Sequence, residues 1–265
     1  MAQLFKSEIE SIQPEWAQAT PKNVRAFFTC RTGGVSSGPW GGPEGIMGMN
    51  LATHTGDAKF CVDMNRQILT QCLPAEPKWL TQVHGVRIVH ADDVQGAPEA
   101  DGSWTKTPGV VCVVMTADCL PVILADRQGR IVAAVHAGWR GLAHGVLQEA
   151  VKTLRAELPD ADLVAWFGPR IGSDEFEVGE DVLEAMTQYL PDAQEAFRAA
   201  PTEGRLLGNL GALARMALST VGVADNSISD CGLSTVSDAK RFYSFRRDGE
   251  QSGRHAALVW INPEN

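Results

Sequence analysis

The sequence predicts an α/β fold built from layered, mixed β-sheets. Apolar periodicities typical of strands and of helices alternate along its 265 residues. Several strand-like runs are apolar on both faces, which requires a covering layer on each side of the sheet. At least two strand pairs are joined by connections too short for a crossover helix, so the sheets must be antiparallel in places. The length and a hydrophobic content of 44% suit one domain spanning residues 1–265.

The first third of the chain combines short strands with one long loop. Runs of apolar and β-branched residues predict strands over residues 24–29, 78–83 and 86–90. Residues 33–48 hold seven glycines and two prolines, a composition that excludes a regular helix or a central strand. We therefore expect a loop there, and a helix over 60–72, where apolar residues recur at three- and four-residue steps.

The remaining elements follow the same two patterns. Strands are expected over 110–115, 120–124, 131–135, 163–167 and 256–261, and helices over 142–158, 180–190 and 206–221. The polar, glycine-containing cluster Asp126–Gly129 separates two of these strands and predicts a hairpin turn.

Charge and cysteine usage restrict the possible partners and compartment. The formal net charge is −9 and the pI about 5.2, so nucleic acid is not an expected partner. Lys6, Glu8 and Glu10 interrupt the apolar stretch that a signal peptide needs, and the longest apolar runs are too short to cross a membrane. Six cysteines without a CxxC pair suit reduced thiols. We expect a soluble, cytoplasmic protein with no membrane partner and no obligate protein partner.

The predicted hairpin brings a cysteine and a histidine together. If it is symmetric about Arg127 and Gln128, Cys119 lies directly opposite His136. Opposed residues have Cβ atoms about 4.5–5.5 Å apart, close enough for a thiolate and an imidazole to bind one metal ion. A slip of one residue would place them on opposite faces of the sheet.

His84 is the third expected ligand. It lies near the end of a predicted strand and before Gly85, and Gln82 shares its face. Two histidines and one thiolate leave a tetrahedral zinc ion one open position, which is the arrangement of catalytic sites. A soft thiolate with imidazoles also accepts copper. The trio His84, Cys119 and His136 therefore predicts a catalytic metal centre, most simply with zinc.

The same residues permit two other interpretations. Cys119 could be a nucleophile activated by His136, with Asp118 or Asp101 assisting, as in a cysteine hydrolase or amidase. Alternatively, Cys119 is a buried thiol and the histidines are polar loop residues, because free cysteine is among the most commonly buried residue types.

Further polar residues could complete a binding site. The junction at 138–141 joins a strand end to a helix start, where free N–H groups favour anions. Arginine forks suit phosphate or carboxylate, although each could equally be a solvated charge in a turn. The segment 244–247, followed by Gly253 and Arg254, adds further candidates. The expected substrate-binding residues are Arg31, Asn50, Gln82, Arg140 and Arg247.

A series of motifs closely resembles those of the bacterial YfiH family, once labelled multicopper polyphenol oxidoreductases or laccase-domain proteins. The motifs run nearly from end to end: CRTGGVSSG with GMNLATHTGD, LTQVHG, TADCLPV, VHAGWRG, GPRIGSDEFEVG and FYSFRRDGEQSGR. The resemblance implies a four-layer α/β/β/α sandwich and a zinc site on His84, Cys119 and His136. Relatives often have a threonine after the cysteine where this chain has Gly232, so Cys231 is left outside the predicted site.

The resemblance also implies an activity. It implies phosphorolysis of the purine nucleosides adenosine, inosine, guanosine and methylthioadenosine, with phosphate as co-substrate, together with adenosine deamination. Arg31, Arg247 and the amides of 138–141 are then the candidates for phosphate. Some relatives resemble a peptidoglycan-editing factor that removes L-serine from UDP-MurNAc-L-Ser, so a hydrolase using Cys119 as nucleophile is an alternative. A copper-dependent polyphenol oxidase fits poorly, because six histidines include no HxH pair. A non-catalytic binding module is the fourth hypothesis.

Overall fold

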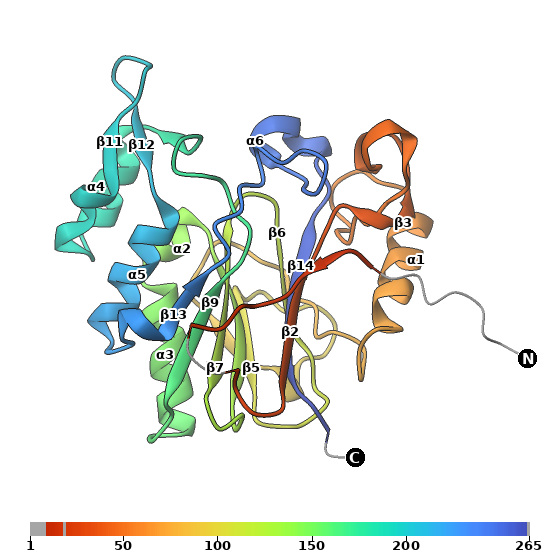
Figure 1. Ribbon diagram of the computed structural model, residues 1–265, viewed down its shortest axis with the longest axis horizontal. Helices are drawn as coiled ribbons and strands as arrows, with labels where there is room; N and C mark the ends of the chain where they lie inside the picture. The colour runs from red at the N-terminus through yellow and green to blue at the C-terminus, as the bar shows by residue number, and fades with distance from the viewer. Residues whose placement is uncertain (1–8, 18–19, 264–265) are drawn as a thin grey trace, which may run out of the picture.

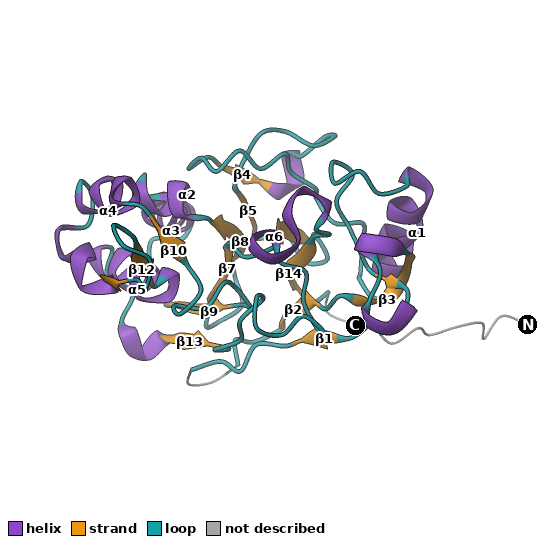
Figure 2. Cartoon of the chain, turned by 90° about the horizontal axis from the view of Figure 1, so that it is seen from above, coloured by secondary structure: helices purple, strands orange, loops and turns teal. Residues whose placement is uncertain are grey.

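Helices and sheets are stacked in four layers, in the order helices, sheet, sheet, helix (Figures 1 and 2). The computed structural model describes residues 9–17 and 20–263. Lys6 and Glu8, on which the expectation of no signal peptide rests, lie outside the described residues. The stacking order of the helices and the two sheets confirms the predicted four-layer α/β/β/α architecture.

The central layer is a mixed six-stranded sheet. Its outer pairs, β13 with β9 and β5 with β4, are parallel, and its inner pairs are antiparallel. In spatial order the strands are β13 (Ile228–Asp230), β9 (Leu163–Phe167), β7 (Leu120–Asp126), β8 (Val132–Ala137), β5 (Gly102–Thr105) and β4 (Ile88–His90).

The second sheet is antiparallel and packs against the first. Its spatial order is β1 (Ser11–Ile12), β2 (Val24–Thr29), β14 (His255–Ile261) and β6 (Cys112–Thr116). A small antiparallel sheet lies outside both layers, with β10 (Glu177–Val178), β12 (Leu206–Gly208) and β11 (Phe197–Ala199).

Helices cover the two outer faces. The six-stranded sheet is covered by α2 (Trp139–Ala143), α3 (Val146–Glu157), α4 (Glu180–Thr187) and α5 (Leu210–Thr220), and the four-stranded sheet by α1 (Lys59–Thr70) (Figure 2). The short helix α6 (Phe245–Asp248) lies over the upper ends of the two sheets (Figure 1). β3 (Thr32–Ser36) leads into the glycine-rich loop, which holds two 3-10 turns, Gly38–Trp40 and Pro43–Gly45; the other 3-10 turns are Ala91–Asp93, Pro191–Ala196, Asp225–Ser227 and Gly249–Gln251.

Three hydrophobic cores follow from this layering. In β7, Val122 and Leu124 pack into the core under the helices, whereas Ile123 and Ala125 pack into the core between the sheets. This alternation explains why the strand is apolar on both faces. A third core lies between the second sheet and α1. No helix among the described residues is long and apolar enough to span a membrane.

Local sequence predicted the longer elements, missed β1, β3, β5, β10, β11, β13 and α6, and misjudged three of the elements that it predicted. β3 occupies part of the 33–48 region that was expected to be a loop. Residues 78–83 form no strand, because Lys78 and Thr81 make only isolated bridges. The helix predicted over 142–158 is interrupted at Gly145, whose φ of 86° is left-handed, so α2 and α3 are separate. The helix predicted from 206 begins only at Leu210, because 206–208 pair in a sheet and the Asn209 side chain accepts the N–H of Ala212. The strands at 24–29 and 163–167 have the predicted bounds.

Candidate metal centre

His84, Cys119 and His136 meet at one edge of the six-stranded sheet. Cys119 directly precedes β7, His136 lies near the end of β8, and His84 lies in the loop before β4. Their potential ligand atoms all lie within 4.8 Å of one another, and Cys119 Sγ is 3.8 Å from His84 Nε2. A tetrahedral zinc ion would separate a sulfur and a nitrogen ligand by about 3.6 Å. The three side chains therefore fit a metal ion with little movement.

The strand register differs from the predicted one. Pro121, not Cys119, pairs with His136, so the assumed symmetry about Arg127 and Gln128 was wrong by two residues. Gly129 adopts a φ of 73° and donates its N–H to Asp126 O, which moves the centre of the turn toward Gly129. A shift of two residues preserves the face of the sheet, and Cys119 still reaches the two histidines.

Gly138 leaves room for these side chains. A Cβ atom at this position would lie 2.8 Å from His84 Cδ2 and 3.1 Å from Cys119 Sγ. Both distances are shorter than ordinary van der Waals contacts. The glycine therefore permits the approach of all three potential ligands.

Asp101 joins two of the potential ligands through its buried carboxylate. Its Oδ1 atom lies 2.8 Å from His136 Nδ1 and accepts the N–H of His84 at 2.9 Å. Its Oδ2 atom accepts the N–H groups of Val83 and Gly85. Burial alone would raise the pKa of Asp101, but the hydrogen bonds from His136 and Gly85 outweigh it and hold the pKa below its ordinary value.

Without a metal, Cys119 and His136 form a charged pair. Burial opposes the thiolate, but the neighbouring His136 and hydrogen bonds with both histidines lower the pKa of Cys119 to about 6. Burial also opposes the imidazolium, yet Cys119 and Asp101 raise the pKa of His136 to about 9. The thiolate is both the metal-binding and the nucleophilic form of cysteine, so the centre can bind a metal or activate a nucleophile.

Asp118 has a different role from Asp101. Its φ is 89°, and its carboxylate accepts hydrogen bonds from the Thr235 hydroxyl, the Ser244 hydroxyl and the N–H of Arg246. Asp118 thus anchors the segment that leads into α6 beside Cys119. Of the two carboxylates considered as partners of His136, Asp101 is the one that contacts it.

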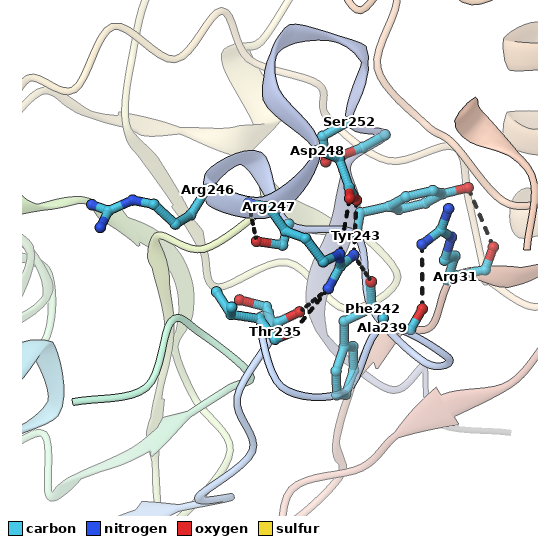
Figure 3. A network of polar contacts seen from close by, with 12 residues as sticks. Arg31, Thr235, Ala239, Phe242, Tyr243, Arg246, Arg247, Asp248 and Ser252 are labelled. Carbon is cyan, nitrogen blue, oxygen red and sulfur yellow. Dashed lines mark hydrogen bonds and ion pairs between the residues drawn. The ribbon is translucent and has the colours of Figure 1, made fainter. Parts of the chain in front are cut away.

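Two of the predicted substrate residues bind backbone instead (Figure 3). Arg31 donates from its three guanidinium nitrogens to Gly41 O, Pro39 O and Ala239 O, and so fastens the glycine-rich loop. Arg247 likewise uses all three nitrogens, and its acceptors are Thr235 O, Val236 O, Phe242 O and the Asp248 carboxylate. The structure gives both arginines structural partners.

The other predicted residues are placed in three different ways. Asn50 is buried, and its amide contacts Thr55, Asp57 and backbone groups. Gln82 pairs with the N–H and C=O of Met115, as a neighbouring strand would. Arg140 is exposed and its guanidinium lies 4.4 Å from the Trp139 ring centre. Of these three, only Arg140 presents an exposed charge.

The structure singles out Arg254, a candidate in the sequence that was not among the five expected substrate-binding residues. Its guanidinium is partly buried, and burial lowers its pKa while the charges of Cys119 and Asp118 act in the opposite direction. Arg254 Nη1 donates to Ser252 O and Gly253 O; Nε and Nη2 have no hydrogen-bond partner among the described residues. The guanidinium also lies 5.5 Å from the ring centre of Phe245, which is 48% exposed. Gly253 and Arg254 were recognised in the sequence as a polar cluster, but nothing local indicated that the charge of Arg254 interacts with Cys119.

Comparisons with known proteins place the chain among relatives of the same length and fold. A family model described as "multi-copper polyphenol oxidoreductase laccase" matches residues 25–262. A Pseudomonas aeruginosa protein named purine nucleoside phosphorylase is 43% identical over 94% of this chain and 98% of its own length. The Escherichia coli purine nucleoside phosphorylase YfiH is 41% identical, with the same two coverages. A crystal structure of a Neisseria meningitidis protein superposes with a TM-score of 0.86 at 41% identity, covering 96% of this chain and 99% of that one.

Proposed function

Since this chain belongs to the multi-copper polyphenol oxidoreductase laccase family, which includes relatives named purine nucleoside phosphorylase, we propose that it is a zinc-dependent purine nucleoside phosphorylase. The observation that carries the proposal is the convergence of His84, Cys119 and His136, with potential ligand atoms within 4.8 Å, together with the partly free guanidinium of Arg254, whose charge interacts with Cys119. We include adenosine, inosine, guanosine and methylthioadenosine as substrates, adenosine deamination as a second activity, and a cytoplasmic location. The catalytic unit is proposed to span residues 1–265.

Phosphorolysis requires few chemical groups from the protein. A phosphate oxygen attacks the anomeric carbon of the ribose, the bond to the base nitrogen breaks, and the base leaves with the bonding electrons and takes up a proton. Positive charge develops on the sugar, so fixed groups that hold the phosphate and the departing base stabilise the transition state. A bound zinc ion would supply a Lewis acid.

The chain offers specific groups for these tasks. Arg254 has two guanidinium nitrogens free among the described residues, and an arginine fork binds phosphate through paired hydrogen bonds. Arg140, exposed near Gly138, is a second phosphate candidate. Phe245 follows Ser244, whose hydroxyl donates to Asp118, and Val83 directly precedes His84 in the chain. Both are exposed apolar side chains and would contact the base. Arg31, Asn50, Gln82 and Arg247 would shape the site rather than touch the phosphate.

The decisive experiment measures products with defined metal content. Protein with quantified zinc is incubated with adenosine, with and without phosphate, and compared with Cys119→Ala and His136→Ala. We expect adenine and ribose 1-phosphate only when phosphate is present, and loss of both product and zinc in the variants. Inosine formed without phosphate would report deamination. Zinc-loaded protein that yields no purine product would overturn the proposal.

One observation favours a second function. Cys119 lies beside His136, and His136 contacts Asp101, so the three residues can act as nucleophile, base and orienting carboxylate, which is the arrangement of covalent hydrolases. The corresponding candidate is a hydrolase that releases L-serine from UDP-MurNAc-L-Ser through Cys119. Release of serine by metal-free protein, lost in Cys119→Ala, would support it. We do not propose copper-dependent phenol oxidation, because a single cluster of suitable ligands is present among the described residues and multicopper chemistry requires several.

A further inference from the structure

We propose that Asp101 is a positioning residue that sets the places of His84 and His136 before any metal ion binds. The inference rests on the metal centre of the proposed function and concerns a residue that does not itself belong to the ligand trio. One buried carboxylate makes four hydrogen bonds, and all four lead to a ligand or to the residues next to one. The carboxylate of Asp101 therefore links His84 and His136, two potential ligands that lie 52 residues apart in the sequence.

The carboxylate is itself firmly held. Asp101 is fully buried, its N–H donates to Arg87 O at 2.9 Å, and its C=O accepts the N–H of His136 at 2.7 Å. It directly precedes β5, which pairs with both β4 and β8. The side chain therefore starts from a backbone whose position the sheet determines, and it has little freedom to move.

His84 shows most clearly what this carboxylate does. Its φ is 60°, a left-handed conformation that a side chain other than glycine rarely adopts. The N–H groups of Val83, His84 and Gly85 converge on the two oxygens of Asp101, at 3.2, 2.9 and 2.7 Å. Such a conformation persists only where its surroundings impose it, and three hydrogen bonds to one anion do so.

His136 is fixed through its ring. Nδ1 lies 2.8 Å from Asp101 Oδ1, so in the neutral ring Nδ1 carries the hydrogen and Nε2 remains for a metal ion. The two histidine rings then lie with centroids 4.8 Å apart at an angle of 72°. A carboxylate that holds the second nitrogen of a histidine ligand both orients the ring and makes it a stronger donor.

Asparagine at position 101 separates this role from simple filling of space. Its side chain has nearly the same shape, but one oxygen is replaced by an NH₂ group that can only donate. In Asp101→Asn this NH₂ group would face either the N–H groups of residues 83–85 or the Nδ1–H of His136. It cannot accept a hydrogen bond from any of them, so at least one of these contacts is lost. Asp126 provides a matched control: its carboxylate is also fully buried and accepts bonds from Arg130 and from the N–H of Asp162, but it lies at the opposite end of β7 from Cys119.

The first test compares zinc affinity in Asp101→Asn, Asp126→Asn and unaltered protein, by competition with a chromogenic chelator. We expect a 10- to 100-fold weaker affinity in Asp101→Asn and a change of less than about threefold in Asp126→Asn. The visible spectrum of the cobalt-substituted proteins should change only for Asp101→Asn. Equal zinc affinity in the two variants would overturn the inference. Because no nucleoside is present, this result is independent of whether the protein proves to be a phosphorylase.

The second test needs no variant and covers the case in which Asp101→Asn does not fold. Amide hydrogen exchange is measured on the unaltered protein with and without zinc. We expect the amides of Val83, His84 and Gly85 to be protected in both states, because the carboxylate and not the metal holds them. Free exchange in the metal-free protein, with protection appearing only after zinc is added, would show that the metal orders the loop and would overturn the inference.

Discussion

The backbone of Gly138 passes directly beside the thiol of Cys119, and a methyl group at Gly138 would lie 3.1 Å from Sγ. The same methyl group would lie 2.8 Å from His84 Cδ2. Since these are two of the three potential ligands, Gly138 sets how closely they can approach a shared ion without being a ligand itself.

Gly138→Ala should therefore weaken metal binding while leaving every ligand in place. We expect zinc affinity to fall by about tenfold or more, because the added methyl group displaces His84 or Cys119 from a geometry that metals require within a few tenths of an ångström. Chelator competition measures the change. Unchanged affinity in Gly138→Ala would contradict the prediction.

In metal-free protein, Cys119 should be far more reactive than the other buried cysteines. At pH 7 it is largely thiolate, since its neighbours lower its pKa to about 6, whereas burial raises the pKa of Cys30 and Cys112 to about 12 and of Cys231 to about 11. Timed alkylation with iodoacetamide, followed by peptide mass spectrometry, should show at least about a 100-fold faster reaction at Cys119 than at these three residues.

Two further observations would test the origin of that reactivity. Zinc should protect Cys119, because a bound thiolate is not available for alkylation, and the rate should fall as the pH drops below about 6. Exposed Cys72 serves as an internal reference for accessibility. The same rate at Cys119 with and without zinc would argue against its role as a ligand.

Arg254→Gln should impair the use of phosphate more than the use of nucleoside. Removing a guanidinium that pairs with phosphate is expected to raise KM for phosphate about tenfold or more, with a smaller effect on KM for adenosine. Steady-state kinetics with each substrate varied in turn would measure this. Arg215→Gln is the control, because that arginine pairs with Asp225 on the outer helical layer. Equal changes in both KM values would argue that Arg254 has only a structural role.

Stability should fall between pH 7 and pH 5, in part because of His255. This side chain is fully buried among aromatic rings, and burial, aided by the charges of Arg31 and Arg254, lowers its pKa to about 3. The unfolded chain binds a proton below about pH 6.5 and the folded chain does not until about pH 3. His255 therefore lowers the free energy of unfolding as the pH falls, by about 2 kcal/mol at pH 5 relative to neutral pH.

Urea unfolding of metal-free protein at several pH values would isolate this contribution. The stability of His255→Gln is expected to depend less on pH than that of the unaltered protein between pH 7 and pH 5, whatever its absolute stability. Exposed His144, replaced by glutamine, should leave the pH dependence unchanged. Parallel curves for the unaltered protein and His255→Gln would refute the prediction.

The alternation of apolar residues was sufficient to predict the layered fold. β2 and β9 have the predicted bounds. β9 lies directly between Asp162 and Gly168, and β2 follows Asn23 and is separated from Arg31 by Cys30 alone, so polar or glycine residues mark both strands closely. Residues 78–83 show the same kind of pattern without forming a strand, because long-range contacts replace strand pairing. The side chain of Gln82, not its backbone, binds Met115. The N–H groups of residues 83–85 donate to the carboxylate of Asp101. Local pattern does not contain that information.

For the site, residue types and ordered motifs were enough to indicate the three potential ligands and the family. The polar groups that contact these ligands could not be identified without the folded chain. The fold engages Arg31 and Arg247 with backbone carbonyls, brings Arg254 within electrostatic range of Cys119, and places Asp101 between two histidines. Hydrogen bonds between residues distant in sequence depend on strand register and loop path. A two-residue error in the register left the chemistry intact, because side chains alternate between faces of a strand with a period of two.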